Sequence, residues 1–118
     1  MRNLTTAFKA LSDETRLQML GLLFHAGELC VCDFVEVLAI TQSKASRHLR
    51  YLVNAGLVDD RRAAVWVYFR ITASPDSDTA KMLSMLPGLL EGHMPKGLLD
   101  RLAAWQQQKR SGTATCGS

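Results

Sequence analysis

Residues 65–71 alternate strictly between two kinds of side chain, whereas the apolar residues before them recur at helical spacing. This one strand-like segment therefore constrains the fold most. One face of this segment is apolar and consists of Val65, Val67, Phe69 and Ile71. The opposite face consists of Trp66, Tyr68 and Arg70. Such alternation is typical of a half-buried β-strand. Residues 57–61 are expected to pair with it, with Arg62-Ala63-Ala64 at the tip. The chain is therefore predicted to be mainly α with a two-stranded β-hairpin.

Helices are predicted wherever apolar residues repeat every three or four positions. The expected ranges are about 4–11, 14–26, 32–38, 42–55, 78–86 and 96–108. Asp13 and Thr41 are the expected N-caps, and Gly27 and Gly56 the expected stops. Pro87 is expected to end or kink the fifth helix.

The chain has 118 residues, which favours one compact domain. We predict one structured domain over residues 1–108 and a flexible tail over residues 109–118. The sequence has no apolar run that could cross a bilayer and no secretory leader, so a cytoplasmic protein is expected. In that reducing compartment, the three cysteines are expected to be thiols or metal ligands rather than disulfides.

The order of these elements predicts a winged helix-turn-helix, with residues 32–38 and 42–55 as the helix-turn-helix and the hairpin as the wing. Residues facing away from the apolar side of the fourth helix are expected to meet bases and phosphates: Ser43, Arg47, Arg50, with Lys44 at the margin. The hairpin arginines suit phosphates: Arg61, Arg62, Arg70. A solvated face with ordinary surface arginines is the alternative, and the net charge of +3 permits an anionic partner without requiring one. His48 is either a helix-packing residue or a phosphate contact.

One winged module reads one half-site, so a two-fold homodimer on a near-palindromic operator is expected. Apolar residues left over on the first and last helices are the candidate interface: Phe8, Leu11, Leu99, Leu102 and Trp105. Alternatively, they complete the core of the monomer.

Two of the three cysteines, Cys30 and Cys32, are one residue apart just before the predicted DNA-reading helix. Residues at this spacing point apart on a helix, so either Cys30 lies outside the helix or ligand binding distorts its first turn. The helix N-terminus is expected to lower the pKa of a nearby thiol. Two thiolates are too few for a closed zinc site, whereas trivalent arsenic or antimony accepts two or three sulfurs. Cys116 is the candidate third sulfur or an unliganded tail cysteine.

Four stretches resemble the ArsR/SmtB family of metal-responsive repressors: residues 10–17, 28–33, 42–49 and 66–70. Glu28-Leu29-Cys30-Val31-Cys32-Asp33 is similar to the arsenic-sensing motif of the arsenical resistance branch. The resemblance implies a homodimeric repressor that leaves the promoter of an arsenic resistance operon when arsenite or antimonite binds Cys30 and Cys32. It also adds two residues of the recognition-helix motif to the DNA contacts: Gln42 and Ser46.

The chain departs from the family pattern at two positions that bear on function. Val35 stands where the best-known motif has a third cysteine, so Cys116 or an outside thiol must be considered as the third ligand. The wing tip has Ala64 and Val65 in place of a glycine and a basic residue. Because positive φ is costly for alanine, the tip is expected to be longer or differently shaped.

Two other functions compete with this interpretation. The same DNA-binding module could respond to thiol oxidation or to a soft divalent metal such as Cd²⁺ or Zn²⁺. A small thiol enzyme is disfavoured, because the sequence has no Ser/His/Asp set, no paired carboxylates and no glycine-rich phosphate loop.

Overall fold

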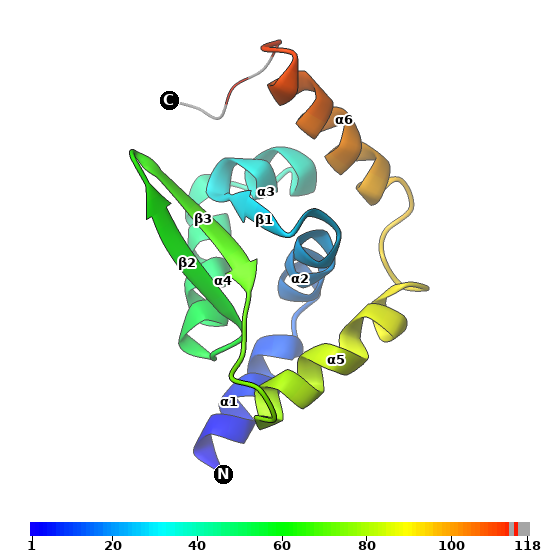
Figure 1. Ribbon diagram of the computed structural model, residues 1–118. Helices are drawn as coiled ribbons and strands as arrows, with labels where there is room; N and C mark the ends of the chain where they lie inside the picture. The colour runs from blue at the N-terminus through cyan, green and yellow to red at the C-terminus, as the bar shows by residue number, and fades with distance from the viewer. Residues whose placement is uncertain (114, 116–118) are drawn as a thin grey trace.

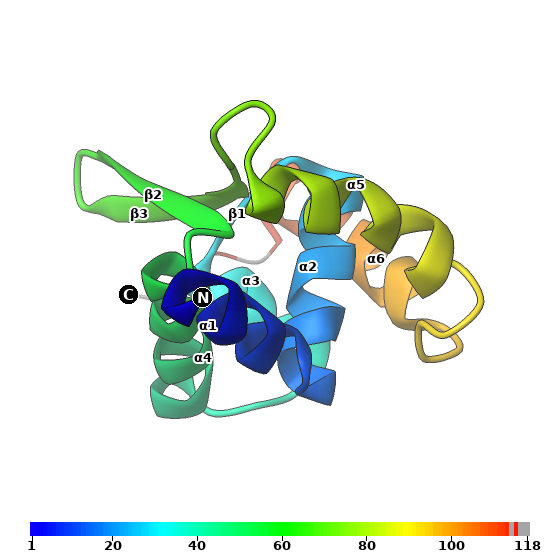
Figure 2. The same cartoon turned by 90° about the horizontal axis from the view of Figure 1, so that it is seen from below.

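The computed structural model describes residues 1–113 and 115, and in this part of the chain an antiparallel sheet lies to one side of a group of helices (Figure 1). The helices are α1 (Arg2–Leu11), α2 (Glu14–Ala26), α3 (Val31–Leu38), α4 (Gln42–Asn54), α5 (Asp78–Leu90) and α6 (Leu98–Arg110). The strands are β1 (Glu28–Cys30), β2 (Val58–Ala63) and β3 (Trp66–Ile71). The β2–β3 hairpin projects away from the helices (Figure 2).

Local signals place the helix ends where the sequence predicts them. The Asp13 carboxylate accepts a hydrogen bond from the Arg16 N–H at 2.9 Å and caps α2. The Thr41 hydroxyl does the same for Lys44 N–H at 3.1 Å at the start of α4. Gly27 follows α2 with φ of 84°, a conformation that glycine adopts without steric cost.

The sheet has a third strand that the sequence does not predict. Its order is β1-β3-β2, and β1 pairs antiparallel to β3 with Cys30 opposite Tyr68. The prediction of a two-stranded hairpin is therefore incomplete. A strand of three residues, 28–30, is too short to show an alternating pattern. Its pairing joins the cysteine segment directly to the wing.

The wing tip is tighter than expected. Ala63 pairs with Trp66, which leaves Ala64 and Val65 as a two-residue turn, and Ala64 takes a φ of 56°. The expectation of a longer tip is wrong, because the cross-strand ladder continues to Ala63 and holds Ala64 in this conformation.

The last two helices also differ from prediction. Helix α5 continues through Pro87 to Leu90. Leu86 and Leu90 are both buried against the core, which favours the extra turn despite the proline. Helix α6 ends at Arg110 rather than at residue 108, so Lys109 belongs to a helix and not to the predicted tail.

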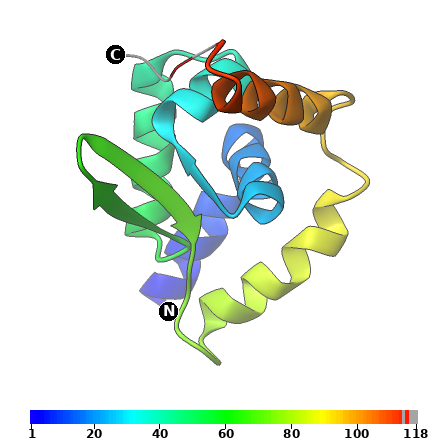
Figure 3. The ribbon, with the colours of Figure 1, turned by 45° about the horizontal axis from the view of Figure 1, so that its top comes forward.

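The core lies between α2, α3, α4 and the sheet, and α6 lies across α3 (Figure 3). The largest fully buried side chains come from these helices and the segment after α4: Met19, Leu20, Leu22, Leu23, Phe34, Val37, Leu49, Leu52 and Leu57. Within the residues that the structure describes, no helix has the length and apolar character needed to span a membrane.

Candidate thiol site and nucleic-acid interface

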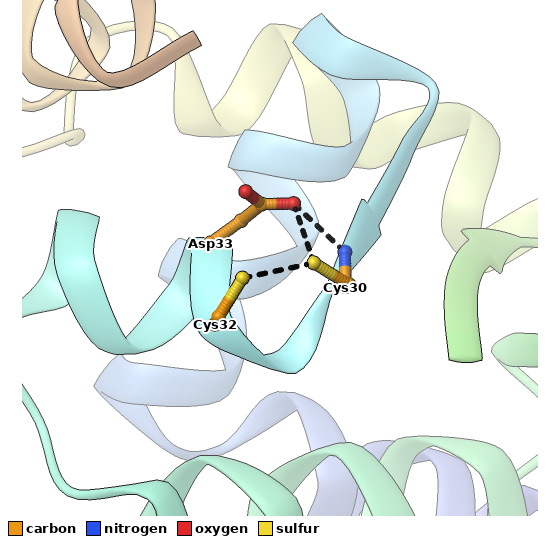
Figure 4. A group of neighbouring side chains, drawn as sticks. All are labelled: Cys30, Cys32 and Asp33. Carbon is orange, nitrogen blue, oxygen red and sulfur yellow. Dashed lines mark hydrogen bonds between the residues drawn. The ribbon is translucent and has the colours of Figure 1, made fainter. Parts of the chain in front are cut away.

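Cys30 and Cys32 converge at the N-terminus of α3 (Figure 4). Cys30 is the N-cap residue, with extended backbone angles of φ −96° and ψ 171°, and Cys32 lies in the first turn. The two Sγ atoms are 3.1 Å apart. Cys32 is disulfide-bonded in this structure, so the expectation of thiols or metal ligands rather than disulfides is wrong for Cys32. Two thiolates that share one centre at ~2.3 Å lie about 3.3–3.8 Å apart, so the pair is close to a chelating geometry. Of the two alternatives, the structure shows Cys30 outside the helix, and the first turn need not unwind for both sulfurs to meet.

Asp33, which the sequence offers beside His25 as a possible further ligand, completes this cluster. Its carboxylate is 3% exposed. One oxygen accepts hydrogen bonds from Cys30 N–H at 2.8 Å and from Cys30 Sγ at 3.2 Å. The other accepts from Trp105 Nε1 at 2.7 Å and Lys109 Nζ at 2.6 Å. The neighbouring cysteines are the only sequence signal for Asp33, because its partners Trp105 and Lys109 are more than seventy residues away.

The charge state of Asp33 follows from these partners. Burial raises the pKa of its carboxyl, but the Lys109 ammonium, the Cys30 N–H and the Trp105 N–H together outweigh burial and bring the pKa below 3.8. Asp33 is therefore ionised at neutral pH, and it forms a buried ion pair with Lys109.

The Cys30 thiol behaves differently from the prediction. Burial, the negative charge of Asp33 and the hydrogen bond to its carboxylate raise the pKa of Cys30 above 9.0. The expectation that the helix N-terminus lowers the thiol pKa is therefore wrong for Cys30. Burial and the Asp33 carboxylate, which lies 3.2 Å from the sulfur, outweigh the effect of the helix end. Cys30 is thus held as a protonated thiol at neutral pH.

Cys30, Cys32 and Asp33 are also the one group of three metal-ligating side chains found among residues 1–113 and 115, with ligand atoms within 4.8 Å of one another. Val35, at the position of the absent third cysteine, is half-buried and packs against the core. Cys116, the predicted third sulfur, lies outside the described residues.

The outer face of α4 matches the predicted DNA-reading surface. Its exposed residues include Gln42, Ser43, Ser46, Arg47 and Arg50, and Lys44 is half-buried. The opposite face, with Ala45, Leu49 and Leu52, is buried as predicted. The predicted helix wheel of α4 is confirmed.

His48 is a packing residue in this structure. Its Nδ1 lies 3.1 Å from an Arg16 guanidinium nitrogen and 3.8 Å from the Asp13 carboxylate. Burial lowers the pKa of His48 below 6.5 despite the nearby Asp13, so the ring is neutral at neutral pH. Arg16 also donates to Ala10 C=O at 2.8 Å and stacks over Tyr51 at 4.0 Å. This cluster fixes α4 against α1 and α2.

Three of the predicted DNA-binding arginines already pair with carboxylates. Arg61 makes two hydrogen bonds to Glu28, at 2.6 and 2.7 Å. Two longer pairs are Arg50 with Asp60 at 3.5 Å and Arg70 with Asp59 at 3.7 Å. Across residues 1–113 and 115, Arg47 and Arg62 form no ion pair and are exposed. Of the predicted DNA-binding arginines, Arg47 and Arg62 therefore have no carboxylate from the described part of the chain to displace before they contact a phosphate or a base.

The candidate dimer residues divide into two groups. Phe8 on α1 is 56% exposed, and Leu11 packs partly against the core. Leu102 is only 4% exposed, and Leu99 and Trp105 pack partly against the core of the same chain. For the α6 residues, the structure favours the alternative that they complete the monomer core. Sequence analysis missed two exposed apolar residues of α5, Met85 and Leu89, which are 60% and 59% exposed.

The first prediction concerns the stability supplied by Asp33. Asp33→Asn is expected to lower the free energy of unfolding at pH 7 by about 1–3 kcal/mol, because it removes charge-assisted hydrogen bonds from a buried site. A carboxyl whose folded pKa is depressed stabilises above its unfolded pKa, and this contribution is lost as the pH falls through the folded value. The difference between native and variant protein should therefore shrink as the pH falls below 3.8. Urea unfolding at several pH values measures it.

Asp100→Asn is the matched control, because Asp100 is exposed on α6. If both variants changed stability equally, or if the Asp33 effect persisted unchanged at low pH, the assignment of an ionised, stabilising Asp33 would be wrong.

Comparison with known proteins now places this geometry in a family. Residues 13–60 match the model of bacterial regulatory proteins of the arsR family. The chain is 46% identical over 74 residues to the arsenic resistance transcriptional regulator ArsR1 of Pseudomonas putida, covering 60% of this chain and 58% of that protein. It is 45% identical over 76 residues to the arsenical resistance operon repressor of Escherichia coli, covering 64% of this chain and 65% of that protein. The match thus spans less than two thirds of each of these two relatives.

Solved structures agree with the fold. The homodimeric winged helix-turn-helix DNA-binding domain Mb0332 from Mycobacterium bovis has a TM-score of 0.64 and 30% identity, covering 78% of this chain and 82% of that one. The antimony-specific transcriptional repressor AntR has a TM-score of 0.59 and 27% identity, covering 75% and 77%. The predicted winged helix-turn-helix is confirmed. The chain is also 44% identical to the arsenic resistance transcriptional regulator ArsR2 of Pseudomonas putida, of which it covers 68%. The chain belongs to the arsR family of bacterial regulatory proteins.

Proposed function

We propose that this protein is a homodimeric repressor of an arsenic resistance operon, which leaves its operator when As(III) or Sb(III) binds Cys30 and Cys32. The observation that carries the proposal is the 3.1 Å separation of the two Sγ atoms at the start of α3, the helix that precedes α4. Two sulfur ligands at this position lie at the start of the helix directly before α4, the proposed DNA-reading helix.

The chemistry of the pair fits a metalloid hydroxide. Arsenous acid binds a thiol by exchanging a hydroxide for sulfur, and the thiol proton leaves with that hydroxide as water. A thiol that is protonated at neutral pH, as Cys30 is, can take part in this exchange without first ionising. Soft sulfur ligands favour such a centre over hard cations. The third ligand is Cys116, an outside thiol or a retained hydroxide.

The relatives support the inducer as well as the fold. Both matched regulators named above act in arsenic or arsenical resistance, and AntR is specific for antimony. The motif around Cys30 and Cys32 lies inside the stretch, residues 13–60, that matches the family model.

Two structural routes lead from the thiol site to the DNA-binding elements. Helix α3 packs against α4, and both helices contribute buried side chains to one core, among them Phe34 and Leu49. Strand β1, which ends at Cys30, is hydrogen-bonded to β3 of the wing. A displacement of Cys30 on ligand binding would therefore reach both the recognition helix and the wing.

The homodimer is proposed to form through α1 and α5. These helices pack together, and Phe8, Met85 and Leu89 supply exposed apolar surface there. Burying such surface in a partner is favourable, and two copies place two recognition helices on one operator.

Thiol oxidation remains a second candidate, favoured by the same short distance between the sulfurs. The two functions predict different inducers, so one titration separates them.

The second prediction concerns the inducer. With the native protein on operator DNA, arsenite is expected to release the complex, as followed by fluorescence anisotropy under reducing conditions. Either Cys30→Ser or Cys32→Ser should abolish release, because one sulfur cannot chelate. Cys116→Ser should weaken release only if the tail supplies a ligand.

The serine variants must bind the operator as tightly as the native protein when arsenite is absent, which controls for folding. Release by peroxide but not arsenite would favour oxidation sensing instead. Release by Cd²⁺ alone would assign a soft divalent metal.

The third prediction concerns DNA binding. Arg47→Ala is expected to weaken operator binding by about 5- to 100-fold, with arsenite affinity unchanged, because Arg47 is exposed and lacks an ion-pair partner in the described part of the chain. Arg61→Ala should cost less, since Glu28 already occupies that guanidinium. Lys81→Ala, on the exposed side of α5, is the charge-matched control. A larger loss from Lys81→Ala than from Arg47→Ala would place DNA on another face.

The fourth prediction concerns the dimer. Phe8→Ser or Leu89→Ser is expected to raise the dimer dissociation constant about tenfold or more, because each removes exposed apolar surface from the proposed interface. Sedimentation velocity at several concentrations measures it. Val65→Ser is the control, since Val65 is 85% exposed but lies at the wing tip. Equal effects from all three would disprove an α1–α5 interface.

A further inference from the structure

We infer that helix α6 is a moving part of the regulator: Asp33 ties the C-terminal half of α6 to the Cys30 thiol, and ligand capture at that thiol loosens it. The inference rests on the proposed function, because it takes As(III) as the ligand. It assigns to α6 a role beyond the winged helix-turn-helix.

The contacts of Cys30, Trp105 and Lys109 meet at Asp33. Its buried carboxylate accepts from Cys30 on one oxygen and from Trp105 and Lys109 on the other, all within 3.2 Å. A cap for α3 requires only the bond from Cys30 N–H. The bonds from Trp105 and Lys109, more than seventy residues away on α6, are not needed for capping. They make the Asp33 carboxylate an anchor that α3 and α6 share.

The two halves of α6 are held by different forces. Leu98 and Leu102, in the first half, are buried in the core at 4% exposure each. Arg101 adds a long contact to the Glu36 carbonyl at 3.4 Å. In the second half, Trp105 and Lys109 both bond to Asp33. A change at Asp33 therefore acts on residues 105–110 and leaves the apolar first half in place.

Ligand capture changes what Asp33 can accept. When Cys30 exchanges its proton for arsenic, a sulfur–arsenic bond forms, an arsenic–hydroxide bond breaks, and one water molecule leaves. The sulfur then has no proton to donate to the Asp33 oxygen 3.2 Å away. Lone pairs on sulfur and oxygen face each other at that distance, so the carboxylate is pushed from its position. The bonds from Trp105 and Lys109 lengthen with it.

Coupling of this kind works in both directions. If the anchored α6 favours the site without ligand, then weakening the anchor from the α6 side must raise the affinity for arsenite. This reciprocal effect distinguishes coupling from a simple structural role, because a merely destabilised site would bind arsenite less well.

The test uses Trp105 as a reporter in the full-length chain. The sequence has two tryptophans, so Trp66→Phe leaves Trp105 as the only one. Arsenite binding is measured by equilibrium dialysis, and acrylamide quenching of Trp105 is measured in parallel. Quenching is expected to rise at least twofold on saturation with arsenite, at the same concentration that fills the site.

In the same background, Lys109→Met removes the charged partner of Asp33, and Lys109→Arg retains it. Lys109→Met should raise quenching without arsenite and increase arsenite affinity about fivefold or more. Lys109→Arg should stay near the parent. Arg110→Met is the matched control, since Arg110 bonds only to Gln107 among the side chains described.

The outcomes separate the two claims. If arsenite binds and releases DNA while Trp105 quenching stays constant, α6 is not coupled and the inference is wrong, but the proposed function stands. The inference also fails if Lys109→Met and Arg110→Met have equal arsenite affinities. If dialysis shows no arsenite binding, the proposed function is wrong and the inference falls with it. Should Lys109→Met not fold, the Trp105 titration of the parent alone decides.

Discussion

The buried carboxylate of Asp33 is the interaction on which the thiol site depends. It fixes the backbone of Cys30 at the entrance to α3, keeps the thiol protonated and holds Trp105 and Lys109 in place. A charge at 3% exposure is tolerated only when donors surround it. Those donors come from β1 and α6, so one charged group determines how these distant segments meet at α3.

The short strand β1 gives the sulfur pair its geometry. An extended Cys30, paired with Tyr68 of β3, directs its side chain back toward Cys32 in the first helical turn. On a continuous helix the two sulfurs would point apart. The change from strand to helix between two neighbouring cysteines therefore creates the chelating pair and connects it to the wing.

Much of the scaffold follows from local signals in the sequence. Asp13, Thr41 and Gly27 mark helix ends correctly, and the alternation of residues 66–71 places Phe69 in the core. The cysteine pair is equally visible. The rest depends on long-range contacts: β1 exists because β3 lies beside it, α5 passes Pro87 because Leu90 is buried, and Asp33 acquires its role from α6. No local pattern encodes these pairings, and the wing arginines likewise look unpaired until Glu28, Asp59 and Asp60 are placed in space.

The bond between Glu28 and Arg61 has a consequence for how the wing would discriminate among duplexes. The Glu28 carboxylate already occupies the Nε–Nη2 edge of this guanidinium. A phosphate that makes one contact gains little by displacing the Glu28 carboxylate. A phosphate that accepts two hydrogen bonds from Arg61 would replace both bonds that Glu28 gives up. If Arg61 contacts DNA as proposed, it would favour a phosphate that reaches two of its nitrogens over a loosely held one, so Glu28, on the strand that ends at Cys30, would weaken nonspecific attraction.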